Sequence, residues 1–253
     1  MKSVLVKRLI RKLPPKILYR ALAWKMYFIG ERECRILKKM VNRRKAAIDI
    51  GANRGSYTYW LSKLSPRVIS FEPLPYLAQY LNCVVPSNVE VINKGLSTET
   101  KQVLINIPII EGYVVEGEAT INHLDMSCEQ HQIELAILDS FKFKNIGFIK
   151  IDVEGHEAEV LLGAKETIQT SRPIILIEIE QRHIHFPIAK VFSILLEMEY
   201  YGYFLLDKNL MPLARFDINT HQNIRTLGTG RYINNFIFTP TPVMNIAEML
   251  ATA

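Results

Sequence analysis

The sequence has 253 residues, of which 49% are hydrophobic and 22% are charged, as in an ordinary globular protein. This composition excludes a disordered chain, a collagen-like repeat and a small disulfide-bonded scaffold. The charge is uneven, because residues 1–45 carry 15 Lys and Arg but only two acids, Glu31 and Glu33, for a net charge of +13. Residues 46–253 carry a net charge of −7. A basic leader before an acidic body indicates an anionic partner for the leader, either a membrane or a nucleic acid.

Cysteine usage and the N-terminus bear on the compartment. Cys34, Cys83 and Cys128 are odd in number and match no metal or redox spacing, so we expect reduced thiols. The first 18 residues lack an apolar core of signal-peptide length, and no apolar run approaches the roughly 20 residues that span a bilayer. We therefore expect a cytoplasmic protein, and lipid binding by the leader would place it at the inner face of the membrane.

The leader has the pattern of amphipathic helices. Leucines recur every four residues from Leu5 to Leu13 among lysines and arginines, two prolines follow, and a helical pattern resumes over residues 17–41. A basic amphipathic helix suits an anionic lipid surface, so peripheral membrane contact through residues 1–45 is one interpretation. The other interpretation is that the apolar stripe packs on the domain or on a second subunit.

From residue 46 onward, short apolar runs alternate with helical repeats, which predicts one domain over residues 46–253. The expected strands are Ala46–Ile50, Val68–Phe71, Val89–Ile92, Phe148–Val153, Ile174–Ile179, Tyr203–Leu206 and Asn235–Thr239. Such an order predicts an α/β fold with a Rossmann-like parallel sheet and helices on both faces. Residues 100–145 depart from this order, because Val103–Ile109 alternate with period two, and we expect a small antiparallel insertion over one end of the sheet.

The first candidate site is the segment from Asp49 to Thr58. Gly51 and Gly55 allow a tight turn close to a ligand, and a helix that begins near Ser56 offers free backbone N–H groups. Asn53 stands where a dinucleotide-binding loop has a second glycine, and Asp49 would repel a pyrophosphate but suits a cation. The loop therefore favours a cofactor that has a positive charge and no phosphate.

Glu72 adds a second feature to that site. It ends the next strand, 21 residues after Gly51, where an acid can accept both hydrogen bonds of a ribose diol. A ribose, a positive charge and no phosphate together describe S-adenosyl-L-methionine. The alternative interpretation is a glycine-rich connector followed by a surface glutamate.

The second candidate site is the segment Lys150–Glu157. Lys150, Asp152 and Glu154 share one face of a strand, where charges are costly to bury unless they are paired. Ligands of open α/β sheets bind beyond the carboxyl ends of the strands, which is where these acids are expected. We interpret Asp152, Glu154 and His156 as candidate catalytic residues that orient an acceptor hydroxyl or take its proton. The alternative is a Lys150–Asp152 ion pair and a solvated helix N-terminus.

Further polar residues follow the next strand. Glu178 and Glu180 have the chemistry to hold Mg²⁺ together with Asp152, but we favour acids at the rim of the sheet and assign no metal ligands. We expect His183 and His185 at the surface, because their spacing matches no zinc site.

These segments together resemble the FkbM family of S-adenosylmethionine-dependent methyltransferases. The matching segments are IDIGANRGSYT at 48–58, FEP at 71–73, NKGLS at 93–97, IKIDVEGHE at 149–157 and RPIILIEIE at 172–180. The resemblance covers residues 46–240. It implies a seven-stranded class I methyltransferase sheet and O-methylation, often of sugars or polyketide-type natural products.

The resemblance also implies roles for individual residues. Those that would line the methionine end of S-adenosyl-L-methionine are Asp49, Gly51, Asn53, Gly55 and Tyr57. Glu72 would hold the ribose, and the segment from Asn93 to Leu96 would border the adenine. Asp152 and Glu154 fall on the second motif of the family, whereas the position of His156 varies in the family, which weakens its candidacy as the general base.

The prediction is therefore an S-adenosylmethionine-dependent O-methyltransferase that acts on a hydroxyl of a sugar or glycan, or of a small natural-product acceptor. One alternative is a nucleic-acid methyltransferase that binds the phosphate backbone through the positive charges of the leader. Against this alternative, the body is acidic and has no basic groove rich in aromatic residues. Another alternative is a non-catalytic cofactor-binding or scaffold protein. We expect the leader to lie apart from the methyltransferase chemistry.

Overall fold

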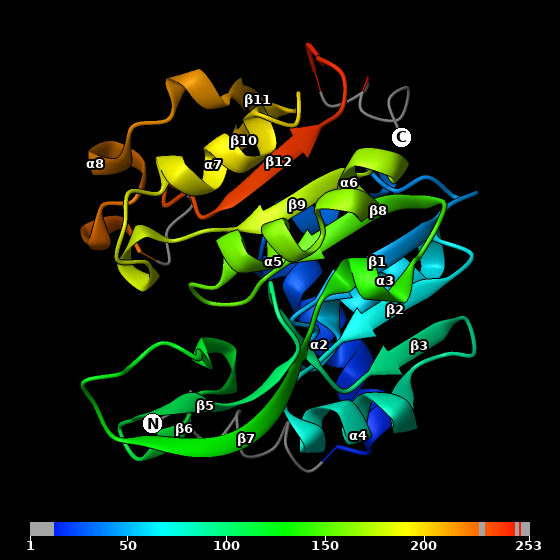
Figure 1. Cartoon of the computed structure of the whole chain (residues 1–253), viewed down its shortest axis with the longest axis vertical. Coiled ribbons are helices and arrows are strands. Elements are labelled where there is room, and N and C mark those ends of the chain that lie inside the picture. The colour runs from blue at the N-terminus through cyan, green and yellow to red at the C-terminus, as the bar shows by residue number, and fades with distance from the viewer. Residues whose placement is uncertain (1–12, 228–230, 246–247, 249–253) are drawn as a thin grey trace.

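The computed structural model describes residues 13–227, 231–245 and 248, and its centre is an eight-stranded sheet (Figure 1). Across the sheet the strands are β3 (Val89–Ile92), β2 (Val68–Phe71), β1 (Ala46–Ile50), β8 (Ile146–Ile151), β9 (Ile174–Glu178), β12 (Asn235–Thr239), β10 (Tyr201–Leu206) and β11 (Asn209–Pro212). The five strands from β3 to β9 are parallel, whereas β12 runs antiparallel to both of its neighbours. All seven expected strands are present, and β11 adds an eighth by pairing antiparallel with β10.

Helices cover both faces of this sheet (Figure 1). One face is covered by α5 (Glu157–Gly163), α6 (Lys165–Ser171) and α7 (Ala189–Leu196), and the other by α3 (Ser56–Leu64) and the short helix η1 (Glu33–Lys39). Successive residues of a strand point to opposite faces, so Ile48 and Ile50 enter the first core and Ala47 enters the second.

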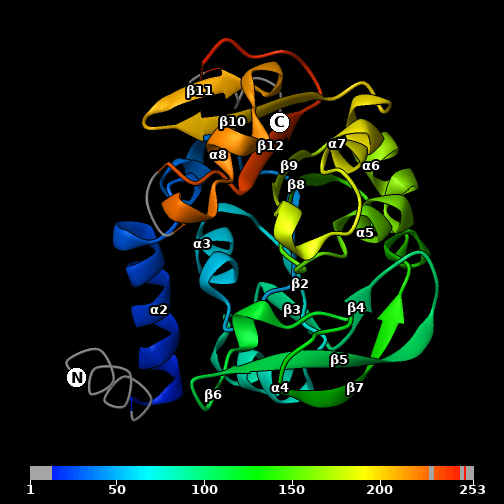
Figure 2. The same ribbon diagram turned by 90° about the vertical axis from the view of Figure 1, so that its left-hand side faces the viewer.

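The leader is part of the same packed structure from residue 13 onward. α2 (Pro15–Ile29) lies beside α3 and α4 (Pro75–Val84), at the edge of the molecule in Figure 2. Tyr19 of α2 is buried, and a Cβ on Gly55 would lie 2.7 Å from the Tyr19 ring, so the helix and the loop after β1 are in close contact. One face of α2, with Leu18, Tyr19 and Ala23, thus packs on the domain. The helix expected over residues 5–13 lies almost entirely outside the described residues.

The insertion forms a second sheet, whose strands are β4 (Gly95–Leu96), β7 (Cys128–Ala136), β5 (Lys101–Ile110) and β6 (Tyr113–Val114) in that order. β5 and β7 pair antiparallel, as expected, while the short β4 pairs parallel with β7. Figures 1 and 2 show this sheet beside α4 at one end of the molecule. Apolar side chains of β5 and β7 pack on Leu74 and Leu77 at the start of α4, which fixes the insertion to the main domain.

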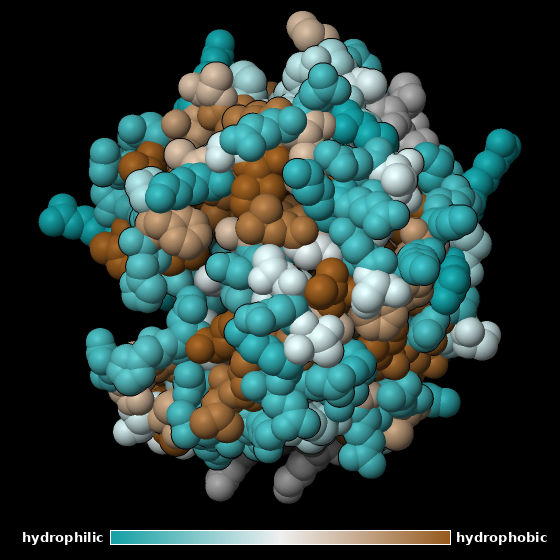
Figure 3. All heavy atoms as spheres, viewed as in Figure 1, coloured by the Kyte–Doolittle hydropathy of each residue, from teal (hydrophilic) through white to brown (hydrophobic). Residues whose placement is uncertain are grey.

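The surface in Figure 3 mixes polar and apolar side chains and is indented between the insertion and the loop after β9. This indentation lies on the side of the molecule to which β8 and β9 point their carboxyl ends (Figure 1). Ligands of open α/β sheets bind at that edge. Within the described part of the chain, no helix has both the length and the apolar character needed to cross a membrane.

Candidate active site

The loop after β1 approaches the end of β8 very closely. Gly51 has a φ of 78°, and the N–H groups of Gly51 and Ala52 both donate to the carbonyl oxygen of Phe71 at 3.0 Å. A Cβ on Gly51 would lie 1.8 Å from the carbonyl oxygen of Asp152. Glycine is therefore required at this position, because both the backbone conformation and the contact exclude a side chain.

Glu72 holds this loop and the end of β2 together. Its buried carboxylate accepts a hydrogen bond from the Asn53 N–H at 2.6 Å through Oε2 and from the Leu74 N–H at 2.9 Å through Oε1. The side-chain amide of Asn93 supports the same turn by donating to the carbonyl oxygens of Glu72 and Pro73. Burial raises the pKa of Glu72 to about 7, although the two N–H donors oppose the rise.

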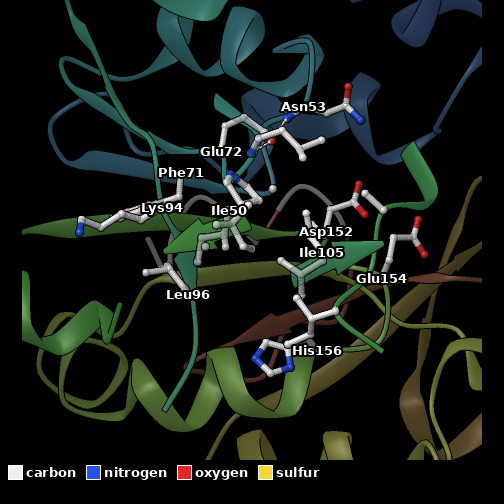
Figure 4. A pocket seen from close by; sticks show the side chains of 18 of the residues that line it. Ile50, Asn53, Phe71, Glu72, Lys94, Leu96, Ile105, Asp152, Glu154 and His156 are labelled. Carbon is white, nitrogen blue, oxygen red and sulfur yellow. Dashed lines mark hydrogen bonds between the residues drawn. The ribbon is translucent and has the colours of Figure 1, made fainter. Parts of the chain in front are cut away.

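A cavity opens beside Glu72 (Figure 4), and we call it the adenosine cavity because of the ligand that it fits. Ile50 and Phe71 of the main sheet line it from one direction. The insertion and its flanks supply six further apolar lining residues, which are Leu96, Ile105, Ala119, Ile121, Ile133 and Leu135. An apolar slot next to a carboxylate suits a flat base joined to a ribose diol.

A second cavity, the methionine cavity, shares Gly51, Asn53 and Asp152 with the first. Its remaining lining residues are Leu22, Met26, Asp49, Ala52, Arg54, Ser56, Tyr57 and Lys150. The cavity therefore offers a guanidinium and the free N–H groups at the start of α3 to an anion, and carboxylates to a cation. An amino-acid moiety carries both charges, so the lining fits the methionine part of S-adenosylmethionine.

Two charged residues of the methionine cavity are fixed by partners of their own. Asp49 is buried and accepts a hydrogen bond from the Thr58 hydroxyl at 2.5 Å. Burial raises the pKa of Asp49 to about 6, and the bond from Thr58 opposes the rise. Arg54 is paired with Glu116 of the insertion at 2.8 Å, which ties the insertion to the loop after β1.

Lys150 lies in the middle of a cluster of polar side chains, which we call the polar centre. Its side chain has no appreciable exposure, and its ammonium donates to the Oδ1 atom of Asn235 at 3.3 Å. The same nitrogen lies 3.6 Å from Oδ2 of Asp152, 3.9 Å from Oε2 of Glu178 and 5.0 Å from the centre of the Tyr57 ring. Burial lowers the pKa of Lys150, but the surrounding carboxylates, Asp152 first, outweigh burial and hold it above its ordinary value.

Glu31 brings the leader into this centre. The Tyr57 hydroxyl donates to Oε2 of Glu31 at 2.5 Å. Carboxylate oxygens of Glu31, Asp152 and Glu178 all lie within 4.8 Å of one another. Burial raises the pKa of Glu31, although the Lys150 ammonium and the bond from Tyr57 lower it. Contrary to expectation, the leader does not lie apart from the candidate site, because the chain after α2 brings Glu31 to Tyr57, Asp152 and Glu178.

The three candidate catalytic residues do not converge on one point. Figure 4 shows the carboxylates of Asp152 and Glu154 pointing to one side, whereas the His156 ring points away from them. Asp152 lines both the adenosine and the methionine cavities. The ring of His156 is held by the Ser97 hydroxyl at 3.0 Å on Nε2 and by Glu159 at 3.3 Å on Nδ1, and burial lowers its pKa.

His183 stands opposite Glu154, and its expected place at the surface is wrong. Its Nδ1 lies 2.7 Å from the Glu154 carboxylate, and only 14% of the His183 side chain is exposed. Burial lowers the pKa of His183, but the bond to Glu154 raises it by more. His185, by contrast, is exposed, as expected.

A model of the FkbM methyltransferase domain matches residues 49–205, which is more than half of the chain. The chain belongs to the FkbM methyltransferase family. The matched domain is the methyltransferase domain of that family, and the sheet, with β12 reversed, is the sheet of class I methyltransferases.

Several solved structures are similar to this chain. Methyltransferase FkbM from Methylobacillus flagellatus KT aligns with a TM-score of 0.52 at 16% identity, over 92% of this chain and 57% of that chain, so this chain spans little more than half of that protein. A SAM-dependent methyltransferase from Aquifex aeolicus aligns with a TM-score of 0.44 at 13% identity, over 90% and 98%. SMU.1697c from Streptococcus mutans, in complex with SAH, aligns with a TM-score of 0.43 at 11% identity, over 81% and 93%. No curated protein sequence matches the chain.

Most of the residues that the FkbM resemblance marks for the cofactor lie around the two cavities. These are Asp49, Gly51, Asn53, Tyr57, Glu72 and Leu96. Gly55 instead faces Tyr19 and the side chain of Leu81, and Asn93 supports the turn behind Glu72. Sequence reasoning missed Glu31 and Asn235, and a signal exists for each: Glu31 is one of two acids in a basic leader, and Asn235 begins an otherwise apolar strand.

Proposed function

We propose that this FkbM methyltransferase transfers the methyl group of S-adenosyl-L-methionine to a hydroxyl of a sugar, a glycan or a similarly polar natural product. The observation that carries the proposal is the position of Asp152. Its carboxylate lines both the adenosine and the methionine cavities and lies 3.6 Å from the Lys150 ammonium. A sugar hydroxyl is a poor nucleophile at neutral pH, and a fixed carboxylate at the junction of the two cavities would align it and accept its proton.

The residues around the two cavities fit the cofactor in detail. Glu72 would accept the ribose hydroxyls, since each of its oxygens uses only one acceptor position on a backbone N–H. The apolar residues of β4, β5 and β7 would enclose the base. Asp49 would attract the ammonium group, while the free N–H groups at the start of α3 would attract the carboxylate.

The cofactor supplies a methyl group on a sulfonium, whose S–C bond breaks with its electron pair on sulfur as the new O–C bond forms. Asp152 would take the hydroxyl proton at its carboxylate, and Lys150 would steady that carboxylate through its charge. Glu154, held by His183 at 2.7 Å, would accept a hydrogen bond from a neighbouring hydroxyl of the acceptor. His156 would line the adenosine cavity and would not take the proton, because both of its ring nitrogens already have partners.

A nucleic-acid acceptor is the second candidate, and the charge around the site argues against it. The described residues at the rim include the carboxylates of Glu31, Glu116, Asp152, Glu154 and Glu178. A phosphate backbone tracked along these groups would meet repulsion rather than counterion release. A salt-dependent gel shift with RNA or DNA at nanomolar protein would overturn the preference for a sugar-like acceptor.

Calorimetry and a transfer assay test the proposed function together. We expect S-adenosylmethionine and SAH to bind, and tritium from the labelled methyl group to appear on members of a panel of methyl glycosides. Asp152→Asn should keep cofactor affinity within a few-fold and lower transfer by at least roughly 100-fold, the range of a lost general base. The matched control is Glu197→Gln, an exposed acid after α7. No cofactor binding at millimolar concentration, or full transfer by Asp152→Asn, would refute the proposal.

We also propose that the outer face of α2 contacts an anionic lipid surface, which would bring the enzyme to lipid-linked glycans. Three large apolar side chains on this helix are exposed: Ile17 by 52%, Trp24 by 43% and Phe28 by 63%. Their spacing places them on one stripe, and Trp24 stacks on Phe28 at 5.4 Å. The exposed cations between them are Lys16, Arg20 and Lys25. Apolar anchors flanked by cations are the pattern of interfacial helices.

Vesicle sedimentation tests this contact. The full chain should bind phosphatidylserine-containing vesicles at low salt and lose binding in phosphatidylcholine alone. The double variant Ile17→Ser and Phe28→Ser should bind at least tenfold more weakly, whereas Leu196→Ser, an exposed position on α7, should bind as the parent does. Equal binding by the double variant would refute the contact.

A further inference from the structure

A third cavity, with a volume of about 670 Å³, lies between the leader and the start of β12. Its lining includes Glu31 and Arg32 of the leader, Glu118 of the insertion, Arg182 after β9, and the polar residues Tyr232 and Asn235. Its volume is in the range of small-molecule sites. We propose that this cavity is the acceptor site, that it takes a neutral polyhydroxylated ring such as a sugar, and that Glu31 orients that ring. This inference rests on the proposed function and specifies the acceptor side of it.

The position of the cavity supports an acceptor site. Glu31 and Asn235 line it, and both residues also belong to the polar centre around Lys150. The carboxylate of Glu31 lies within 4.8 Å of that of Asp152, which in turn lines the two cofactor cavities. A ligand that fills the third cavity therefore reaches Asp152, which also borders the two cofactor cavities, so that Asp152 would lie beside the acceptor hydroxyl.

The chemistry of the lining indicates a neutral ligand with many hydroxyls. Three carboxylates and three guanidinium groups line the cavity, so their formal charges cancel: Glu31, Glu33 and Glu118 against Arg32, Arg35 and Arg182. Carboxylates and carboxamides accept hydrogen bonds, and guanidinium, carboxamide and phenol groups donate them, which matches hydroxyls that both donate and accept. Ile29, Leu205 and Ile233 add apolar surface for the C–H face of a ring.

Two of the three guanidinium groups are closely engaged already, which argues against a phosphorylated acceptor. Arg182 is paired with Glu180 at 2.6 Å, and Arg35 donates to the carbonyl oxygens of Tyr27 at 2.9 Å and Phe28 at 2.8 Å. A phosphate would require donors that are released from such bonds, because Arg recognises phosphate through its paired N–H groups. Hydroxyls need no such release.

Glu31 is placed to orient the acceptor rather than to hold the cofactor. Its Oε2 accepts the hydrogen bond of the buried Tyr57 hydroxyl, which fixes the carboxylate at the mouth of the polar centre. The remaining acceptor positions of Glu31 would bind one hydroxyl of the ring, so that a neighbouring hydroxyl faces Asp152. In the transfer, that hydroxyl gives its proton to Asp152 and its oxygen gains the methyl group, while the electron pair of the broken S–C bond stays on sulfur.

Saturation-transfer NMR with a panel of methyl glycosides, recorded in the presence of SAH, tests the acceptor site. The parent protein should transfer saturation to the ring protons of at least one glycoside. Glu31→Gln keeps the bond from Tyr57 and should weaken glycoside binding or kcat/KM at least tenfold, with SAH affinity changed less than threefold. Leu227→Trp, at an exposed position on the cavity wall, should weaken glycoside binding by obstruction. Leu196→Trp on α7 is the matched control and should behave as the parent does.

The outcomes separate this inference from the function beneath it. Failure of the parent to bind SAH would refute the proposed function itself. SAH binding without any glycoside signal would refute the acceptor class. Glycoside binding that survives both Glu31→Gln and Leu227→Trp would refute the location of the site, and preference for a glycoside phosphate over its neutral counterpart would refute the neutral character of the cavity.

Discussion

Replacing Glu72 by glutamine is the sharpest test of how the cofactor is held. Each carboxylate oxygen of Glu72 accepts one backbone N–H, from Asn53 at 2.6 Å and from Leu74 at 2.9 Å, and keeps one acceptor position for a ribose hydroxyl. Glutamine retains one oxygen but presents an NH₂ group to the second N–H and to one ribose hydroxyl. One charge-assisted bond to the ligand is lost, which is about 1.5–3 kcal/mol, or roughly a 10- to 100-fold weaker Kd.

The same change lowers stability, and this decides which variant is informative. In Glu72→Gln one buried N–H loses its acceptor, at about 1–3 kcal/mol, whereas Glu72→Ala leaves both N–H groups without one, at about 2–6 kcal/mol. Domains of this kind have total stabilities of about 5–15 kcal/mol. The alanine variant therefore confuses unfolding with loss of affinity, and the glutamine variant is preferable.

The assay is calorimetric titration with SAH, together with the melting temperature of each free protein. Glu90→Gln on β3 is the control, because its carboxylate is 51% exposed and pairs only with the surface residue Arg67. We expect the control to bind SAH as the parent does. A Kd for Glu72→Gln within twofold of the parent value, in a protein that melts as a folded domain, would show that Glu72 does not hold the ribose.

Four further predictions concern buried charges and close contacts. Burial raises the folded-state pKa of Asp49 to about 6 and that of Glu72 to about 7, above their unfolded values, so their contribution to stability is complete below about pH 4 and is lost as the pH rises through 6 to 7. The melting temperature of the free protein should therefore fall from about pH 5 to about pH 8. A melting temperature that rises over this interval would contradict these pKa values. Over the same interval the Kd for S-adenosylmethionine should decrease by calorimetry, because both acids bind the cofactor as carboxylates. Lys150→Met should lower the free energy of unfolding in urea by about 3–5 kcal/mol, since it leaves the carboxylates around Lys150 without their buried cation, and an unchanged midpoint would refute that account. Gly51→Ala should abolish SAH binding, because its Cβ would lie 1.8 Å from the Asp152 carbonyl, and retained affinity would mean that the loop can move aside.

Seven of the eight strands of the main sheet could be predicted from the sequence because each is a short, mainly apolar run between helical or turn-forming segments. What could not be predicted is where a distant backbone interrupts a local pattern. The apolar residues of 157–168 have the spacing of one helix, but the structure has two helices, α5 and α6, separated at Ala164, directly after Gly163, where a Cβ would lie 2.1 Å from the carbonyl oxygen of Ser97. That contact joins residues 66 positions apart, and the helical spacing of the apolar residues does not contain it.

The candidate site divides in the same way. Gly51, Glu72 and Asp152 could be predicted because each stands at the end of a strand, and the edge of a parallel sheet brings such positions together. The apolar wall of the adenosine cavity could not be predicted, because Ile105, Ile133 and Leu135 have the ordinary alternation of a half-buried strand. Only the packing of the insertion on the main domain turns them toward Glu72.

The net charge of the leader is a poor guide to its role in the fold. Its 15 Lys and Arg point to an anionic partner, but its two acids carry the information about the site. Glu33 is buried, and burial raises its pKa to about 7, while Glu31 accepts the Tyr57 hydroxyl bond beside Lys150. Removing residues 1–45 would therefore strip an acid from the polar centre and uncover the core that contains Leu37 and Met40. A chain that begins near residue 46 cannot test lipid binding by the leader, because it would lose the fold and the site at once; substitutions on the exposed face of α2 separate the two roles.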